Sequence, residues 1–192
     1  MKSKELFESK STNVVVCDVQ PEYDKWCNRI VAPLCNFLNN QTGKIYVWFN
    51  GQGMSSDEMG DVKNYYEENG LDTEVNDRII FIEKEYGFLR NWIDGGVPDR
   101  IIIKVIRAMV QNKVDYSRLL NLNSVLNDIE QEELNNWEDD GIYFPYWFEV
   151  NEIRNMSPFY ICGGGKDECL KEIELICNAL NIKYKRINNL VY

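Results

Sequence analysis

The chain has 192 residues, which is enough for one well-cored domain and short for two. Hydrophobic residues make up 44% of the chain and aromatic residues 12%, so the composition excludes a disordered protein. The formal net charge of −10 argues against unaided binding to nucleic acid or to an anionic membrane.

Other features of the sequence bear on the location of the protein and on the catalytic groups that it can use. No apolar run reaches membrane-spanning length, and the first residues, MKSKELFESKSTN, hold no apolar signal core, so we expect a cytoplasmic protein with no membrane attachment. Histidine is absent, which removes the commonest general base and zinc ligand. Abundant asparagine and isoleucine are typical of AT-rich genomes, many of them viral. Most of the six cysteines are predicted to be buried free thiols: Cys17, Cys27, Cys35, Cys162, Cys169 and Cys177.

Short apolar runs alternate with segments of helical spacing along the chain. Strands are predicted over residues 13–20, 44–50, 78–84, 158–164 and 182–187, and helices around 26–38, 62–66 and 168–180. This alternation predicts right-handed crossovers in a three-layer αβα Rossmann-like domain, an α/β fold with a mainly parallel sheet of about five strands.

One segment interrupts the alternation. Residues 89–157 are predicted to form a helical and aromatic insertion within a single domain that spans residues 1–192. Its aromatic part, residues 142–150, is open to interpretation as a strand, an interface patch or a lid over a cleft. Burial of these side chains within the chain is the favoured state. They include Tyr143, Phe144, Tyr146, Trp147 and Phe148.

Three chemically useful side chains follow strands of the predicted sheet. Asp18 follows the first strand, Lys84 ends the third, and Cys169 lies in the first turn of the helix after the fourth. The crevice beyond the carboxyl ends of parallel strands is the usual ligand site, so we expect these residues to meet there. A helix N-terminus and an ammonium would both lower the pKa of the thiol, and Asp18 would act as a base.

Three consecutive glycines, Gly163, Gly164 and Gly165, separate the fourth strand from this helix. Such a turn can present backbone N–H groups to an anion, so we predict that these glycines bind a ligand. Each side chain also has an ordinary structural interpretation. Cys169 would be a packed thiol, Asp18 a turn residue and Lys84 a solvated charge, while Asp167 would cap the helix.

The segments DVQ (18–20), IEK (82–84) and CGGGKDECL (162–170), taken together, resemble the isochorismatase-like cysteine hydrolase family. The resemblance covers residues 14–88 and 159–187. It implies hydrolysis of a small-molecule amide or related C–N or C–O bond, with Cys169 as nucleophile, Asp18 as base and Lys84 as its partner. It also implies a non-proline cis peptide at Gly164-Gly165 and no cofactor. The metal-binding nicotinamidase branch is excluded because the chain has no histidine.

Two other interpretations stay open. Asp18, Asp115 and Asp167 are similar to the scattered acidic residues of NYN and PIN-type nucleases, which implies Mg²⁺ or Mn²⁺ and a nucleic acid partner. The chain can also be interpreted as a non-catalytic Rossmann-like binding or assembly module. The hydrolase interpretation predicts a small-molecule substrate and no nucleic acid partner, and a homo-oligomer is compatible with all three.

Overall fold

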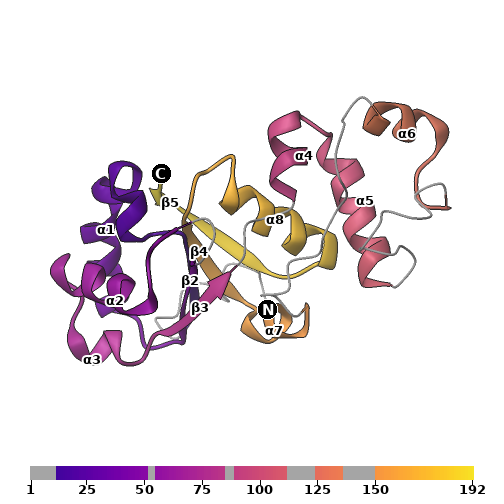
Figure 1. Ribbon diagram of the computed structural model, residues 1–192. Coiled ribbons are helices and arrows are strands. Elements are labelled where there is room, and N and C mark those ends of the chain that lie inside the picture. Colours follow the sequence, from indigo (N-terminus) through magenta and orange to yellow (C-terminus); the bar gives the residue numbers. More distant parts are fainter. Residues whose placement is uncertain (1–11, 52–54, 85–88, 112–123, 136–149) are drawn as a thin grey trace.

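The computed structural model describes residues 12–51, 55–84, 89–111, 124–135 and 150–192 (Figure 1). Its centre is a five-stranded sheet in the order β3-β2-β1-β4-β5, and every strand pair is parallel. The strands are β1 (Asn13–Cys17), β2 (Ile45–Asn50), β3 (Ile80–Lys84), β4 (Phe159–Gly163) and β5 (Tyr184–Val191). The five predicted strands and their parallel arrangement are therefore confirmed.

Helices cover both faces of the sheet, which confirms the three-layer α/β fold. One face packs against α1 (Asp24–Asn39), α2 (Met59–Glu68) and α3 (Thr73–Asn76), with the 3-10 turn η2 (Pro21–Tyr23) leading into α1. The other face packs against α4 (Leu89–Gly95), α5 (Asp99–Val110), α7 (Val150–Met156) and α8 (Cys169–Leu180), and α6 (Asp128–Asn135) lies further out (Figure 1).

The central strand β1 shows why the apolar runs are nearly continuous. Val14 and Val16 point into the core beneath α1 and α2, whereas Val15 and Cys17 point into the core beneath α5 and α8. All four side chains are fully buried. Successive side chains of a strand point to opposite faces, so a strand covered on both sides must be apolar at every position.

The segment between β3 and β4 is helical where the structure describes it. α4 and α5 supply buried side chains, including Leu89, Ile101 and Ile106, to the core that α8 also lines. These helices therefore form part of the layer on this face of the sheet. Most of the predicted aromatic segment lies outside the described residues, including Tyr143, Phe144, Tyr146, Trp147 and Phe148.

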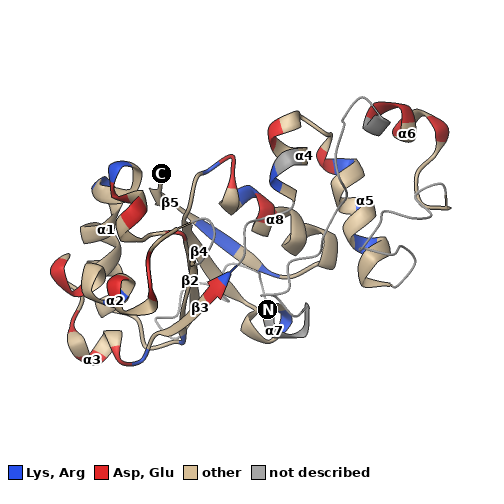
Figure 2. Cartoon of the chain, in the orientation of Figure 1, with Lys and Arg blue, Asp and Glu red and all other residues tan. Residues whose placement is uncertain are grey.

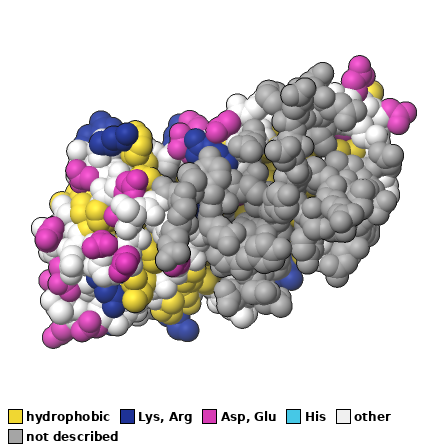
Figure 3. All heavy atoms as spheres, in the orientation of Figure 1, with side chains coloured by type: hydrophobic (Ala, Val, Ile, Leu, Met, Phe, Trp, Pro, Cys, Tyr) yellow, Lys and Arg dark blue, Asp and Glu magenta, His cyan; other side chains and the backbone are white. Residues whose placement is uncertain are grey.

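The acidic excess is visible on the described surface. Acidic side chains lie over the end of the molecule that carries α2 and α3 (Figures 2 and 3), where Asp61, Glu68 and Glu74 are exposed. This surface repels the phosphates of a nucleic acid backbone. Among the helices of the described ranges, none has both the length and the apolar character needed to cross a membrane.

Candidate active site

A buried ion pair lies at the carboxyl end of the sheet. Lys84 Nζ is 3.0 Å from Asp18 Oδ2, and the two side chains are 3% and 1% exposed. Lys84 Nζ also donates to Oδ1 of Asn50, at the end of β2, over 2.8 Å. The ends of three adjacent strands thus converge on one ammonium, and the interpretation of Lys84 as a solvated charge is wrong.

The charges of this pair depend on each other. Burial lowers the pKa of Lys84, but the Asp18 carboxylate and, to a smaller extent, Cys17 and Cys169 together reverse that effect, so the pKa lies above its ordinary value and the side chain stays an ammonium. Its partner oxygen, Asp18 Oδ2, also accepts a hydrogen bond from Cys17 Sγ at 3.3 Å. The second oxygen, Asp18 Oδ1, is buried and has no hydrogen-bond partner among the described residues, so its capacity to accept a hydrogen bond is unused.

Cys169 is the first residue of α8, as predicted, and it is the one partly exposed cysteine of the six. Arg90 Nη1 lies 4.0 Å from its sulfur. Burial raises the pKa of the Cys169 thiol, and the Asp18 carboxylate raises it further, against the lowering effect of Lys84. The expectation of a lowered thiol pKa is therefore wrong, because desolvation and the carboxylate outweigh the ammonium. Cys169 rests as a protonated thiol beside a carboxylate.

The glycine turn is shaped by its approach to β1. Gly163 has a φ of +82°, and a Cβ at this position would lie 2.3 Å from the carbonyl oxygen of Cys17. Gly164 has a φ of +37°, and its N–H donates to the same oxygen. These two glycines are therefore required by backbone packing, and of the three only Gly165 lines the cavity described next.

The predicted cis peptide bond at this turn is wrong. Within the described ranges the cis bond is Ser157-Pro158, so the bond between Gly164 and Gly165 is trans.

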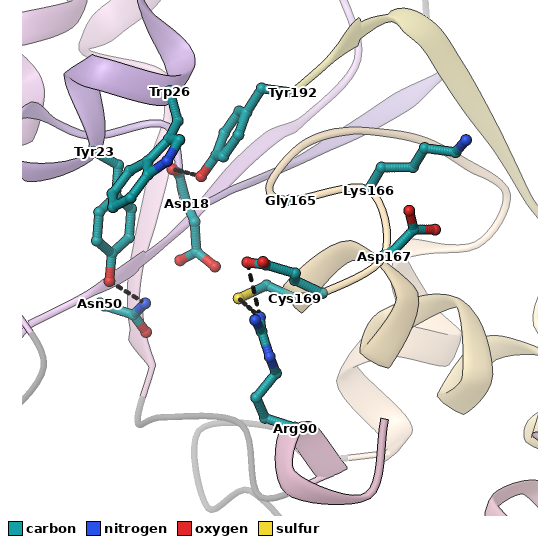
Figure 4. Close-up of a pocket in the computed structure, with 11 residues that line it drawn as sticks. Asp18, Tyr23, Trp26, Asn50, Arg90, Gly165, Lys166, Asp167, Cys169 and Tyr192 are labelled. Atoms are coloured by element: carbon teal, nitrogen blue, oxygen red, sulfur yellow. Dashed lines mark hydrogen bonds and ion pairs between the residues drawn. The ribbon is translucent and has the colours of Figure 1, made fainter. Parts of the chain in front are cut away.

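A cavity of about 510 Å³ opens at this end of the sheet (Figure 4). It is lined by Asp18, Tyr23, Trp26, Asn50, Arg90, Gly165, Lys166, Asp167, Glu168, Cys169 and Tyr192. Three aromatic rings lie together on one side of the cavity, across from the start of α8 (Figure 4). The helical spacing places Trp26 in line with buried residues of α1, but Trp26 is 48% exposed at the cavity. The space is of the size that small-molecule sites have.

The glutamine of the D-x-Q segment holds the neighbouring loop. Gln20 is fully buried, and its Nε2 lies 2.9 Å from each of three acceptors, namely the Asn50 carbonyl, Ser55 Oγ and Asp57 Oδ2. Its Oε1 accepts from the backbone N–H of Asn50 at 2.8 Å. Gln20 thereby fixes Asn50, which in turn contacts the Lys84 ammonium.

Several residues of this site were not predicted from the sequence. Asn50 ends a strand, so its position at the carboxyl edge was a usable signal. No such signal marked the other three residues, which reach the cavity only through tertiary packing. They are Tyr23 of η2, Arg90 of α4 and Tyr192, which follows β5. Glu172 was also missed, although its spacing of three residues from Cys169 places both on one face of α8.

The metal site of the nuclease interpretation is described only in part. Asp115 lies outside the described residues, whereas Asp18 and Asp167 both line the cavity. Across the described ranges, no group of three or more His, Cys, Asp or Glu side chains is arranged to hold a metal ion. The predicted helix cap at Asp167 is wrong, because the N-cap residue of α8 is Glu168 and no side chain caps the helix there.

Comparison of the chain with family models, with curated proteins and with solved structures finds no match.

Proposed function

We propose that this protein hydrolyses an amide or a related C–N or C–O bond of a small molecule, with Cys169 as nucleophile, Asp18 as general base and Lys84 as its partner. One observation carries the proposal: the buried Asp18 has one oxygen held by Lys84 and a second oxygen without a partner among the described residues, and it lines the same cavity as Cys169. A thiol, a base and a group that orients the base are the components of nucleophilic catalysis.

The reaction would begin with a proton transfer. Asp18 takes the thiol proton as the sulfur of Cys169 attacks the carbonyl carbon, and the carbonyl π electrons move to oxygen. The backbone N–H groups of Gly165, in the turn before α8, and of Cys169, its first residue, have no acceptor among the described residues, and they would donate to that oxyanion. Lys84 compensates the negative charge that passes between carboxylate and sulfur.

Bond cleavage follows from the same groups. The electron pair returns from the oxyanion, the C–N bond breaks, and Asp18 gives its proton to the leaving nitrogen. Water then attacks the thioester with Asp18 again as base, and the carboxylic acid leaves as the Cys169 thiol re-forms. The steps balance with water as co-substrate, and the acyl C–O bond of an ester would be cleaved in the same way.

The proposal is tested with a panel of small primary amides and ureides, in which ammonia release and product acids are measured. Hydrolysis by the native protein should fall by a factor of about 10³ or more in Cys169→Ala and in Asp18→Asn, because both residues act in one step. Cys35→Ala removes a buried thiol from the opposite face of the sheet and should retain turnover. Turnover that survives Cys169→Ala, or a panel of which no member is hydrolysed, would contradict the proposal.

A further inference from the structure

Glu172 is a buried acid next to the proposed site that the reaction above does not use. It is 3% exposed and lies on α8, three residues after Cys169. Its Oε1 accepts a hydrogen bond from the backbone N–H of Leu89 at 3.3 Å. A carboxylate in this position is costly to bury, so a contribution to the site would account for it.

Three charged groups from other elements interact electrostatically with Glu172, namely Lys84 of β3, Asp18 after β1 and Arg90 of α4. Glu172 also acts on Cys169 of its own helix, α8. Burial raises the pKa of Glu172 to about 7, against the lowering effects of Lys84 and of the Leu89 N–H. The ionised carboxylate in turn raises the pKa of the Cys169 thiol.

The hydrogen bond to Leu89 also links Glu172 to Arg90. Leu89 begins α4, and the next residue, Arg90, places its guanidinium 4.0 Å from the sulfur of Cys169 and 2.9 Å from Glu168 Oε2. Glu172 thus ties the start of α4 to the helix that carries the thiol.

We propose that Glu172 is a positioning residue for Cys169: its carboxylate holds the start of α4 and Arg90 beside the thiol, and its negative charge disfavours the thiolate. The proposal rests on the proposed function, because it assigns a role relative to the nucleophile. Since the carboxylate gains its charge as the pH rises through neutrality, the reactivity of Cys169 should increase less steeply with pH than that of an isolated thiol.

The charge effect is measured by alkylation of Cys169 with iodoacetamide between about pH 6 and about pH 10, quantified by peptide mass spectrometry. Glu172→Gln keeps an acceptor for Leu89 and removes the charge, so alkylation at alkaline pH should be about threefold to tenfold faster than in the native protein. The matched control is Glu174→Gln on the same helix, whose carboxylate pairs with Arg186, and it should follow the native profile.

The outcomes separate the two proposals. If Cys169 is alkylated and Glu172→Gln gives the same profile as Glu174→Gln, the role of Glu172 is overturned and the hydrolase proposal stands. If Cys169 reacts no faster than the five buried cysteines in every variant, the nucleophile assignment fails, and the role of Glu172 fails with it.

The positioning effect needs a separate measurement, which is amide hydrogen exchange in the segment Leu89–Gly95. Glu172→Ala removes the acceptor and should accelerate exchange there, while Glu172→Gln should not. Equal exchange in the Ala and Gln variants would contradict the positioning role.

Thermal unfolding adds a check that does not depend on reactivity. The folded protein holds the Glu172 proton up to about pH 7 and the unfolded chain releases it at lower pH, so the native protein loses stability between those values as pH rises. The melting temperature of Glu172→Gln relative to native should therefore increase over that window. A difference that is constant with pH would show that Glu172 does not titrate there.

Discussion

The Lys84 ammonium is buried, and a buried charge without an ionic partner lowers the stability of the folded protein. The side chain is 3% exposed, and the Asp18 carboxylate is its ionic partner. Removing one member of such a pair leaves the other charge buried and alone, which costs far more than the pair itself contributes.

Lys84→Met should therefore lower the free energy of unfolding by about 3–5 kcal/mol in urea denaturation, since it strands the Asp18 carboxylate. Lys44→Met is the matched control, because Lys44 is exposed before β2 and should change stability by less than about 0.5 kcal/mol. The double variant Asp18→Asn, Lys84→Met should be more stable than the sum of the two single effects implies. Additive effects would contradict an interacting pair.

The three proposed catalytic residues could be named from the sequence because the carboxyl ends of parallel strands meet at one edge. Their electrostatics could not be predicted. The pKa of Cys169 depends on its desolvation and on the exact approach of Asp18, which oppose the helix N-terminus and Lys84. Arg90 was missed for a related reason, since it reaches the site through the packing of α4 on α8, whereas Glu172 shares a face of α8 with Cys169 and its spacing was a usable signal.

Among the elements, the turn between β4 and α8 combines tight backbone contact with a reactive residue. Gly163 is held against Cys17, and the N–H of Leu170 bonds back to the carbonyl of Gly165. This turn fixes where α8 starts, and so where the thiol lies.

Gly163→Ala should destabilise the protein by about 2 kcal/mol or more, because alanine is strained at positive φ and its Cβ would meet backbone atoms of β1. Gly60→Ala in α2 is the control. A Cβ at Gly60 meets nothing within 4 Å, and alanine favours a helix, so this change should be neutral or stabilising. Equal unfolding midpoints for the two variants would contradict the packing account of the turn.

The strands could be predicted from their apolar runs, but the residues at which each strand begins and ends could not all be predicted. β5 was predicted over residues 182–187 and extends over Tyr184–Val191. Asn188 and Asn189 are exposed on this strand, which lies at the edge of the sheet, so no apolar pattern marks its second half. The N-cap of α8 was predicted at Asp167 and lies at Glu168, one residue later.

At the scale of the whole molecule, Tyr192, the residue after β5, contacts the segment that follows β1. Tyr192 donates its hydroxyl to the carbonyl oxygen of Asp18 at 2.8 Å, and its own carbonyl accepts from the N–H of Lys166. Asp18 has a φ of +53°, which residues other than glycine seldom adopt. Segments far apart in the sequence therefore hold the base in its unusual conformation, and no local pattern could reveal that.

Tyr192→Phe should reduce the free energy of unfolding by about 1 kcal/mol, because it removes one hydrogen bond to a buried backbone group. It should also reduce turnover more than it changes substrate affinity, since Asp18 becomes less well oriented. In the control Tyr184→Phe, the lost contact to Asn178 is exposed and 3.4 Å long, so stability and turnover should stay near native values. Identical effects of the two substitutions would contradict an orienting role for Tyr192.

The coupling of base, ammonium and thiol is tested most directly by the pH dependence of Cys169 alkylation in the native protein and in Asp18→Asn. Burial and the Asp18 carboxylate raise the pKa of Cys169 and Lys84 lowers it, so the substitution removes one of the raising effects and keeps the lowering effect of Lys84. We predict that alkylation in Asp18→Asn begins at lower pH and is about tenfold faster or more near about pH 8, while amide hydrolysis is lost. Asp24→Asn, a change in the first turn of α1, should leave the profile as it is in the native protein. The same alkylation profile in Asp18→Asn as in the native protein would show that carboxylate and thiol are not coupled, and the account would be wrong.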